Sequence, residues 1–170
     1  FIFGLPLRYY RNMNIYIAAD HNGYQMKNEL VEWLQNQKHE VTDFGADEFD
    51  KGDDYPDFGI KVAKAVAEDP DNRYGIVLCG SGVGMAVVAD KVPGIRAALI
   101  HDPAIAEAGQ RDDNINVLAL GADYINIERA QEVITSWLNT PFSGEERHER
   151  RIQKITDYEH SNLCPPTHEK

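Results

Sequence analysis

Short apolar runs alternate with amphipathic stretches along most of this chain. The apolar runs lie at residues 15–19, 40–44, 76–79, 95–100 and 116–120, and each has the length of a buried strand. Between them, the spacing of apolar residues predicts helices at residues 24–34, 56–67, 84–92, 103–111 and 127–138, and a last one at 144–158. Strands and helices that alternate in this way predict an α/β fold, in which a parallel sheet carries helices on both faces.

One domain at residues 13–158 accounts for all of these elements. We expect residues 1–12 to be an N-terminal extension, left by cloning or by translation from an upstream start. We expect residues 159–170, which are polar and contain Pro165-Pro166, to form a flexible tail.

The formal net charge of −11 narrows the range of partners. An acidic protein is repelled by nucleic acid and by anionic membrane surfaces, so we expect neither as a partner. No apolar run approaches the roughly 20 residues that a membrane-spanning helix needs.

The cysteines and histidines show no metal-binding spacing. Cys79 ends a predicted strand and Cys164 lies in the polar tail, so we expect no disulfide. The chain has no C-x-x-C and no H-x-x-x-H pair, and the sequence therefore predicts no metal site. Reduced cysteines of this kind are typical of the cytoplasm.

The most informative segment is Cys-Gly-Ser-Gly-Val-Gly at residues 79–84, which joins a buried strand to a helix. Backbone N–H groups at such a junction stabilise negative charge on a bound ligand or on the sulfur itself, which makes Cys79 a candidate base or nucleophile. Asp20-His21, His101-Asp102 and Gly121 also follow predicted strands. Ligands of parallel sheets bind beyond the carboxyl ends of the strands, so these residues predict one shared site.

Three other interpretations of residues 79–84 stay open. The cysteine suits a small core residue before a tight turn. The glycines also suit a degraded dinucleotide loop, in which Met85 replaces the last glycine and Asp102 imitates the ribose-binding acid. A redox centre is the third interpretation, although no second cysteine lies nearby to resolve it. A P-loop is excluded, because no Gly-Lys-Ser/Thr follows.

A basic segment at residues 147–154 stands out in this acidic chain. Arg147 and Arg151 are four residues apart and share one helix face, where two guanidinium groups suit a phosphate. The alternative is a solvated helix face with ion pairs such as Glu146–Arg150.

Several separated motifs in one order resemble a known family. They are Asp20-His21-Asn22-Gly23, Asp54-Tyr55-Pro56, residues 79–84, residues 92–98, residues 116–121 and Arg147-His148. From about residue 14 to residue 158, the chain resembles the ribose-5-phosphate isomerase B and galactose-6-phosphate isomerase family.

The resemblance implies a Rossmann-like three-layer α/β/α sandwich with a five-stranded parallel sheet. It implies a homodimer, often paired into a tetramer, whose active site lies between two subunits. The implied activity is a cofactor-independent aldose–ketose isomerisation of a sugar phosphate in pentose phosphate metabolism, most simply ribose 5-phosphate to ribulose 5-phosphate.

The resemblance also assigns roles to residues. Cys79 would be the base that moves a proton between C2 and C1 through a cis-enediolate, and Ser81 would assist ring opening or hold a sugar hydroxyl. The amides of Gly80, Gly82, Val83 and Gly84 would stabilise the enediolate oxygen. Asp20 and Tyr55 would contact the sugar, and His21, Arg147 and Arg151 would bind the phosphate.

Three positions depart from the family pattern. Asp112-Asp113 replace a His-Asn pair whose histidine opens the furanose ring, and Asp123 replaces a frequent phosphate-binding arginine. We keep Asp112 among the catalytic positions and Asp113 among the substrate-binding ones, but Asp112 would act as an acid only if its surroundings raised its pKa. Two alternatives therefore stay open: an isomerase of a different or already open-chain sugar phosphate, and a non-catalytic phosphosugar-binding paralogue.

Overall fold

The computed structural model describes residues 12–162, which form a five-stranded parallel sheet between helices. The strands are β1 (Asn14–Ala19), β2 (Glu40–Asp43), β3 (Arg73–Cys79), β4 (Ala97–Leu99) and β5 (Val117–Gly121). Their order in the sheet is β2-β1-β3-β5-β4, and every neighbouring pair is parallel. The predicted α/β class and parallel sheet are therefore confirmed.

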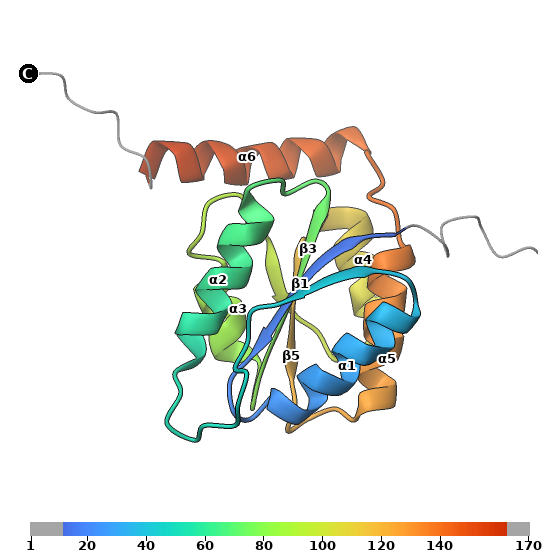
Figure 1. Ribbon diagram of the computed structural model, residues 1–170. Helices are drawn as coiled ribbons and strands as arrows, with labels where there is room; N and C mark the ends of the chain where they lie inside the picture. The colour runs from blue at the N-terminus through green and yellow to red at the C-terminus, as the bar shows by residue number, and fades with distance from the viewer. Residues whose placement is uncertain (1–11, 163–170) are drawn as a thin grey trace, which may run out of the picture.

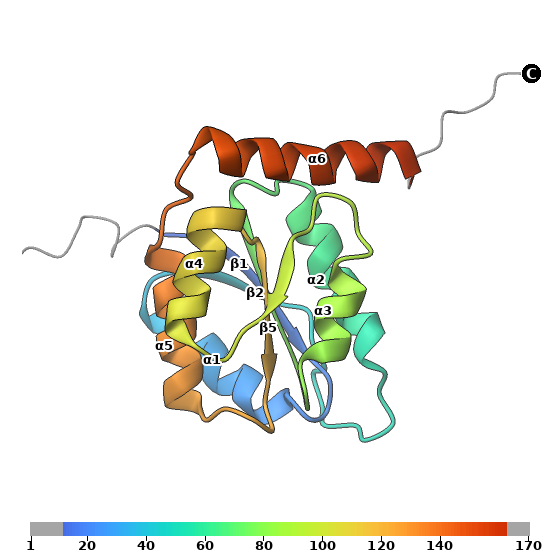
Figure 2. The ribbon, with the colours of Figure 1, turned by 180° about the vertical axis from the view of Figure 1, so that it is seen from behind.

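Six helices surround this sheet. They are α1 (Tyr24–Asn36), α2 (Tyr55–Ala67), α3 (Val83–Ala89), α4 (Pro103–Asp113), α5 (Ile127–Asn139) and α6 (Glu146–Asn162). Helices α1, α4 and α5 cover one face of the sheet, while α2 and α3 cover the other (Figure 1). Helix α6 crosses the amino end of the sheet, opposite to the end toward which the strand arrows point (Figure 2). The result is the three-layer α/β/α sandwich that the family resemblance implies.

The alternation of side chains along β3 explains why the sheet is covered on both faces. Ile76 and Leu78 point into the apolar cluster shared with α1, α4 and α5, whereas Val77 and Cys79 point into the cluster shared with α2 and α3. Because both faces are buried, the strand is apolar at every position from Ile76 to Cys79.

Several predicted boundaries differ from the structure; for example, β3 begins at Arg73 and not at residue 76, and α3 ends at Ala89 and not at residue 92. The predicted strand at 95–100 shortens to Ala97–Leu99, because the N–H of Ile95 bonds in a turn to the Val92 carbonyl and the N–H of Arg96 donates to the Asn116 side chain at 2.8 Å. Helix α6 continues to Asn162, so four residues assigned to the flexible tail are helical. The expected extension at residues 1–11 and the tail from residue 163 onward lie outside the described residues.

The strand order reverses between β1 and β3, and this reversal positions the site. From β1 the chain crosses to β2 at one edge, and from β3 it moves toward β4 at the other edge. The connections after β1 and β3 therefore diverge and leave a crevice beyond the carboxyl ends of these two strands. Among residues 12–162, no helix has both the length and the apolar character needed to cross a bilayer.

The two tryptophans provide a test of how the core is held together. Trp137 is fully buried and its indole N–H donates to Gln110 Oε1 at 2.8 Å and to the Ile115 carbonyl at 3.0 Å. Trp137→Phe should lower the free energy of unfolding by about 1–3 kcal/mol, because it leaves these buried acceptors without a donor.

Trp33→Phe is the matched control, since Trp33 is only half-buried and packs on the same core through apolar contacts. We expect it to cost less than Trp137→Phe in urea unfolding followed by far-UV circular dichroism at one protein concentration. Equal losses for the two variants would mean that the indole hydrogen bonds do not stabilise the fold.

Candidate active site

Cys79 ends β3 with its side chain directed into the cluster shared with α2 and α3, and 6% of the residue is exposed. Its Sγ accepts a hydrogen bond from the backbone N–H of Gly82 at 3.1 Å. Burial alone would suit a small core residue, but the Gly82 N–H aimed at the sulfur shows that the glycine loop contacts the cysteine side chain directly. One backbone N–H of the glycine loop thus points at the sulfur, and the role of Cys79 as a base stays a prediction.

The loop after Cys79 needs glycine because its neighbours come very close. Gly82 has φ of 76°, a left-handed conformation, and a Cβ there would lie 2.8 Å from the Leu120 carbonyl carbon. A Cβ on Gly121, at the end of β5, would lie 2.6 Å from the Ser81 carbonyl oxygen. The loop is therefore pressed onto the end of β5.

Two of the four amides expected to face the ligand are engaged within the loop itself. The N–H of Gly82 donates to Cys79, and the N–H of Val83 donates to the Ser81 hydroxyl at 3.3 Å. Ser81 is exposed beside the buried sulfur, so its hydroxyl can exchange this partner for a ligand at little cost.

Asp20 and His21 follow β1 and lie in the crevice next to the Cys79 loop. The carboxylate of Asp20 is buried and accepts from the backbone N–H groups of Asn22 at 3.0 Å and Gly23 at 3.2 Å. Burial raises the pKa of Asp20 above its ordinary value, and the two N–H groups oppose this rise. The ends of β1 and β3 therefore bring a thiol near a carboxyl group that gains a proton more readily than usual.

Tyr55 and Asp123 pack against two further positions of the loop. The Tyr55 ring packs against Gly84, where a Cβ would lie 2.7 Å from Cζ, and 37% of the residue is exposed. Asp123 packs against Gly80, where a Cβ would lie 2.7 Å from Oδ2, and its N–H donates to the Gly80 carbonyl at 3.0 Å. The departure noted at Asp123 thus puts a carboxylate directly against the loop.

The remaining candidates lie elsewhere in the chain. Asp112 and Asp113 end α4, and Arg147 and Arg151 are exposed on α6, at the amino end of the sheet. Cys79 lies at the carboxyl end of the same sheet, and both ribbon views show α6 at the far end from it (Figures 1 and 2). One chain therefore does not bring the two arginines to its own Cys79 loop.

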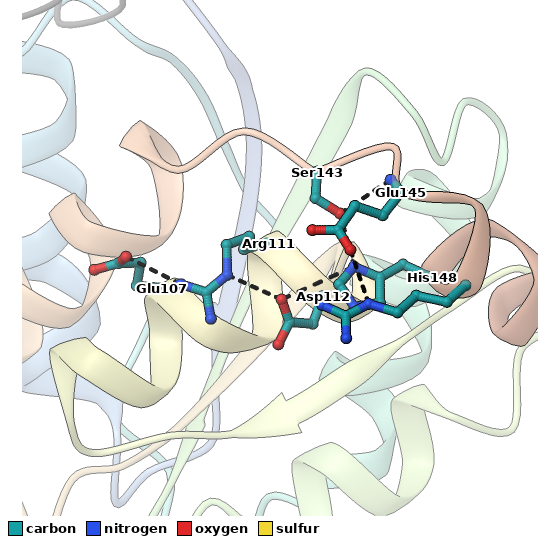
Figure 3. A network of polar contacts seen from close by, with 7 residues as sticks. Glu107, Arg111, Asp112, Ser143, Glu145 and His148 are labelled. Atoms are coloured by element: carbon teal, nitrogen blue, oxygen red, sulfur yellow. Dashed lines mark hydrogen bonds and ion pairs between the residues drawn. The ribbon is translucent and has the colours of Figure 1, made fainter.

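Asp112 belongs to a polar network that joins α4 to the start of α6 (Figure 3). Arg111 Nε donates to Asp112 Oδ1 at 2.9 Å, and that oxygen lies 3.9 Å from Nδ1 of the buried His148. The hydrogen bond from Arg111 lowers the pKa of Asp112 below its ordinary value. The condition for Asp112 to act as an acid is therefore not met in this chain, because its neighbours stabilise the carboxylate.

Arg147 is also paired within this network. Its Nε lies 2.8 Å from Glu145 Oε2, and Glu145 in turn donates its backbone N–H to the Ser143 hydroxyl. Both partners of this ion pair are more than half exposed, so an incoming phosphate can replace Glu145 at little cost.

Sequence reasoning missed Asp53, which lies in the loop before α2. Its Oδ1 accepts from the backbone N–H of His21 at 3.1 Å and contacts His21 Nδ1 at 2.6 Å. Only the run of acidic residues at 46–54 signalled it, and that run predicts no more than a loop.

His101 is half-buried, and its Nε2 accepts from the N–H of Gly121 at 3.1 Å.

Asp102 is not a nucleotide-binding acid in this structure. Its side chain accepts from the N–H of Ala104 at 2.8 Å and caps the N-terminus of α4. This finding removes the ribose-binding residue from the dinucleotide interpretation. Within residues 12–162, no group of three or more His, Cys, Asp or Glu side chains is arranged to hold a metal ion.

Comparison with known proteins identifies the family. The model of the ribose/galactose isomerase family matches residues 15–155. A putative sugar phosphate isomerase of Bacillus subtilis, YwlF, is 42% identical over 151 residues, which are 89% of this chain and 100% of that protein. Ribose-5-phosphate isomerase B of Mycobacterium tuberculosis is 37% identical over 91% of this chain and 94% of its own length.

A solved structure gives the same result. Ribose-5-phosphate isomerase B from Mycoplasma genitalium, crystallised with bound ribulose 5-phosphate, superimposes with a TM-score of 0.84. The two chains are 39% identical, and the match covers 86% of this chain and 96% of that one. The chain described here therefore belongs to the ribose/galactose isomerase family.

Proposed function

We propose that this protein is a cofactor-independent aldose–ketose isomerase that interconverts ribose 5-phosphate and ribulose 5-phosphate. The observation that carries the proposal is the sulfur of Cys79, which lies at the crevice between β1 and β3 with a backbone N–H 3.1 Å away. The family membership and the relatives that carry this activity in their names support it.

The reaction needs a base, a way to stabilise the enediolate and a phosphate site. The Cys79 thiolate takes the proton from C2 of the aldose, the C–H electrons form the C1–C2 double bond, and the carbonyl oxygen becomes anionic. The loop amides stabilise that oxygen. The thiol then returns the proton to C1, and the proton of the C2 hydroxyl moves to the C1 oxygen, so that C2 becomes the carbonyl carbon. Ser81 belongs to the Cys79 loop, Tyr55 packs against Gly84 of that loop, and Asp20 bonds to Leu78 beside it, so these three residues would hold the sugar hydroxyls.

The phosphate requires cations, and we propose that a second copy of the chain supplies them. Arg147 and Arg151 are exposed on α6, away from their own Cys79. The same helix exposes Ile155 and Tyr158, with exposed fractions of 50% and 67%, which suit a protein contact. We propose a homodimer, able to pair further into a tetramer, with two shared sites and acting in the cytoplasm.

Substitution of the proposed base tests the function directly. Cys79→Ser should lower kcat for ribulose 5-phosphate formation by about 100- to 10,000-fold, because a hydroxyl is a far weaker base than a thiolate. Cys164→Ser, at the other cysteine, should leave the rate unchanged. Turnover that survives intact in the Cys79 variant would contradict the assignment of the base.

Mixing two inactive variants tests whether each site is shared. Homodimers of Cys79→Ser and of Arg151→Ala should both be inactive, but a heterodimer contains one site with neither substitution. Random exchange makes about half of the dimers heterodimers, so roughly a quarter of the sites should regain activity. Native mass spectrometry would verify exchange, and heterodimers without recovered activity would contradict the shared site.

The Arg111–Asp112 pair favours a second candidate, an isomerase of sugar phosphates that cannot close into a ring. Furanose opening needs a proton donor at the ring oxygen, and Asp112 is held as a carboxylate by Arg111. A tetrose 4-phosphate has its ring-forming oxygen esterified and needs no such donor. Ribulose 5-phosphate is acyclic for the same reason, whereas ribose 5-phosphate is cyclic.

Enzyme titration separates the two candidates. If the protein does not open the ring, the rate of ribose 5-phosphate consumption should stop rising at high enzyme concentration, because spontaneous opening becomes limiting. The rate from ribulose 5-phosphate should stay proportional to enzyme, and Asp112→His should remove the limit. Proportional rates in both directions would assign ribose 5-phosphate as a full substrate and exclude the second candidate.

A further inference from the structure

The side chain of Asp53 makes all of its described hydrogen bonds to a single residue, His21. Its Oδ1 lies 3.1 Å from the His21 backbone nitrogen and 2.6 Å from His21 Nδ1, across 32 positions of sequence. The backbone donor fixes the main chain at the end of β1, and the ring contact fixes the imidazole. Because Nδ1–H is committed to Asp53, Nε2 is the ring nitrogen left for a ligand.

The burial of Asp53 argues against a role in stability alone. Only 9% of its side chain is exposed, and Oδ2 is buried without a hydrogen-bond partner among the described residues. A buried carboxylate with an unpaired oxygen costs folding free energy, and an asparagine could accept the same backbone N–H without a charge. What the charge adds is a cation-stabilising contact to the imidazole.

Two further carboxylates near His21 also favour its charged form. Asp20 precedes it directly after β1, and Asp50 lies in the same loop as Asp53. The hydrogen bond to Asp53 is the main reason that the pKa of His21 is raised, and the nearby carboxylates add to it, while burial opposes it. Phe49 meets the ring edge-on at 6.4 Å and lines, with Tyr24 and Glu29 of α1, a hollow of about 520 Å³ beside it.

We propose that Asp53 is a positioning residue of the phosphate site, which holds His21 as an imidazolium with Nε2–H free to bind the substrate phosphate. This inference rests on the proposed function for the identity of the substrate. A phosphate monoester becomes a dianion above a pKa of about 6, and an unassisted histidine loses its charge near pH 6.5. Asp53 extends the pH range in which the dianion and the cation exist together.

Asp53→Asn tests the proposal because it keeps the acceptor for the backbone N–H and removes only the charge. Because the pKa of His21 is raised in the folded protein, His21 stays charged until the pH passes that raised pKa. In Asp53→Asn the main cause of the rise is gone, so His21 should lose its charge at a lower pH. If the pKa falls by about one unit, KM for ribulose 5-phosphate should rise up to about tenfold at pH 8 and change little at pH 6. We expect kcat to change less than KM.

Asp50→Asn is the matched control. It removes the same charge from the same loop, but Asp50 is exposed and its Oδ1 accepts from the N–H of Gly52 at 2.8 Å, not from His21. Because Asp50 is the smallest of the contributors to the raised pKa of His21 and Asp53 the largest, the KM profile of Asp50→Asn should shift far less than that of Asp53→Asn. Far-UV circular dichroism and urea unfolding of both variants would verify that each is folded.

A readout without turnover keeps the inference separate from the proposed function. NMR titration of the His21 ring, with and without inorganic phosphate, should give a raised pKa in the wild type, a lower one in Asp53→Asn, and a shift on phosphate addition. A wild-type His21 that titrates as an unassisted histidine, or an unchanged KM profile in Asp53→Asn, would overturn the inference. Absence of any sugar phosphate turnover in the wild type would overturn the proposed function alone, since the NMR result would still stand.

Discussion

The parallel pairing of β1 with β3 is the constraint on which the rest of the site depends. These two strands are neighbours along six residue pairs, from Asn14–Arg73 to Ala19–Leu78. Because the register is fixed by buried side chains on both faces, both strands end at the same level of the sheet. Asp20 and the Cys79 loop are thereby brought side by side although 59 positions of sequence separate Asp20 from Cys79.

The distribution of charge is the reason for our proposal that a second copy of the chain completes the site. Asp123 lies against the Cys79 loop, Asp20 follows the neighbouring strand β1, and Asp53 contacts His21, the residue after Asp20. A phosphorylated sugar is itself an anion, so this set of carboxylates would repel it without added positive charge. The exposed arginines of α6 are suitable in charge but lie at the opposite end of their own sheet.

The spacing of apolar residues predicted the strands and helices well, because the two-residue repeat of a strand and the 3.6-residue repeat of a helix are local properties of the chain. The buried face of α1, including Lys27, and the buried face of α5 could be predicted from spacing alone. The contact of Lys27 Nζ with Asp43 Oδ2 could not, because it depends on where β2 is placed. The same limit applies to Asp53, whose meaning depends on a loop that folds back onto β1. Asp112 required the structure for another reason: only its hydrogen bond to Arg111 shows which form of the carboxyl group is stabilised.

The close packing around the glycine loop has a consequence for how such a protein can change over evolution. At Gly80, Gly82 and Gly84, even a methyl group would come within 2.7 Å of a neighbouring atom. At Gly82 the neighbours include the backbone of β5 and φ is positive, so a side chain there is strained, whereas at Gly80 and Gly84 the neighbours are the side chains of Asp123 and Tyr55. A change of the loop at Gly80 or Gly84 would therefore require a matching change at Asp123 or Tyr55, so the loop and these two side chains would have to vary together.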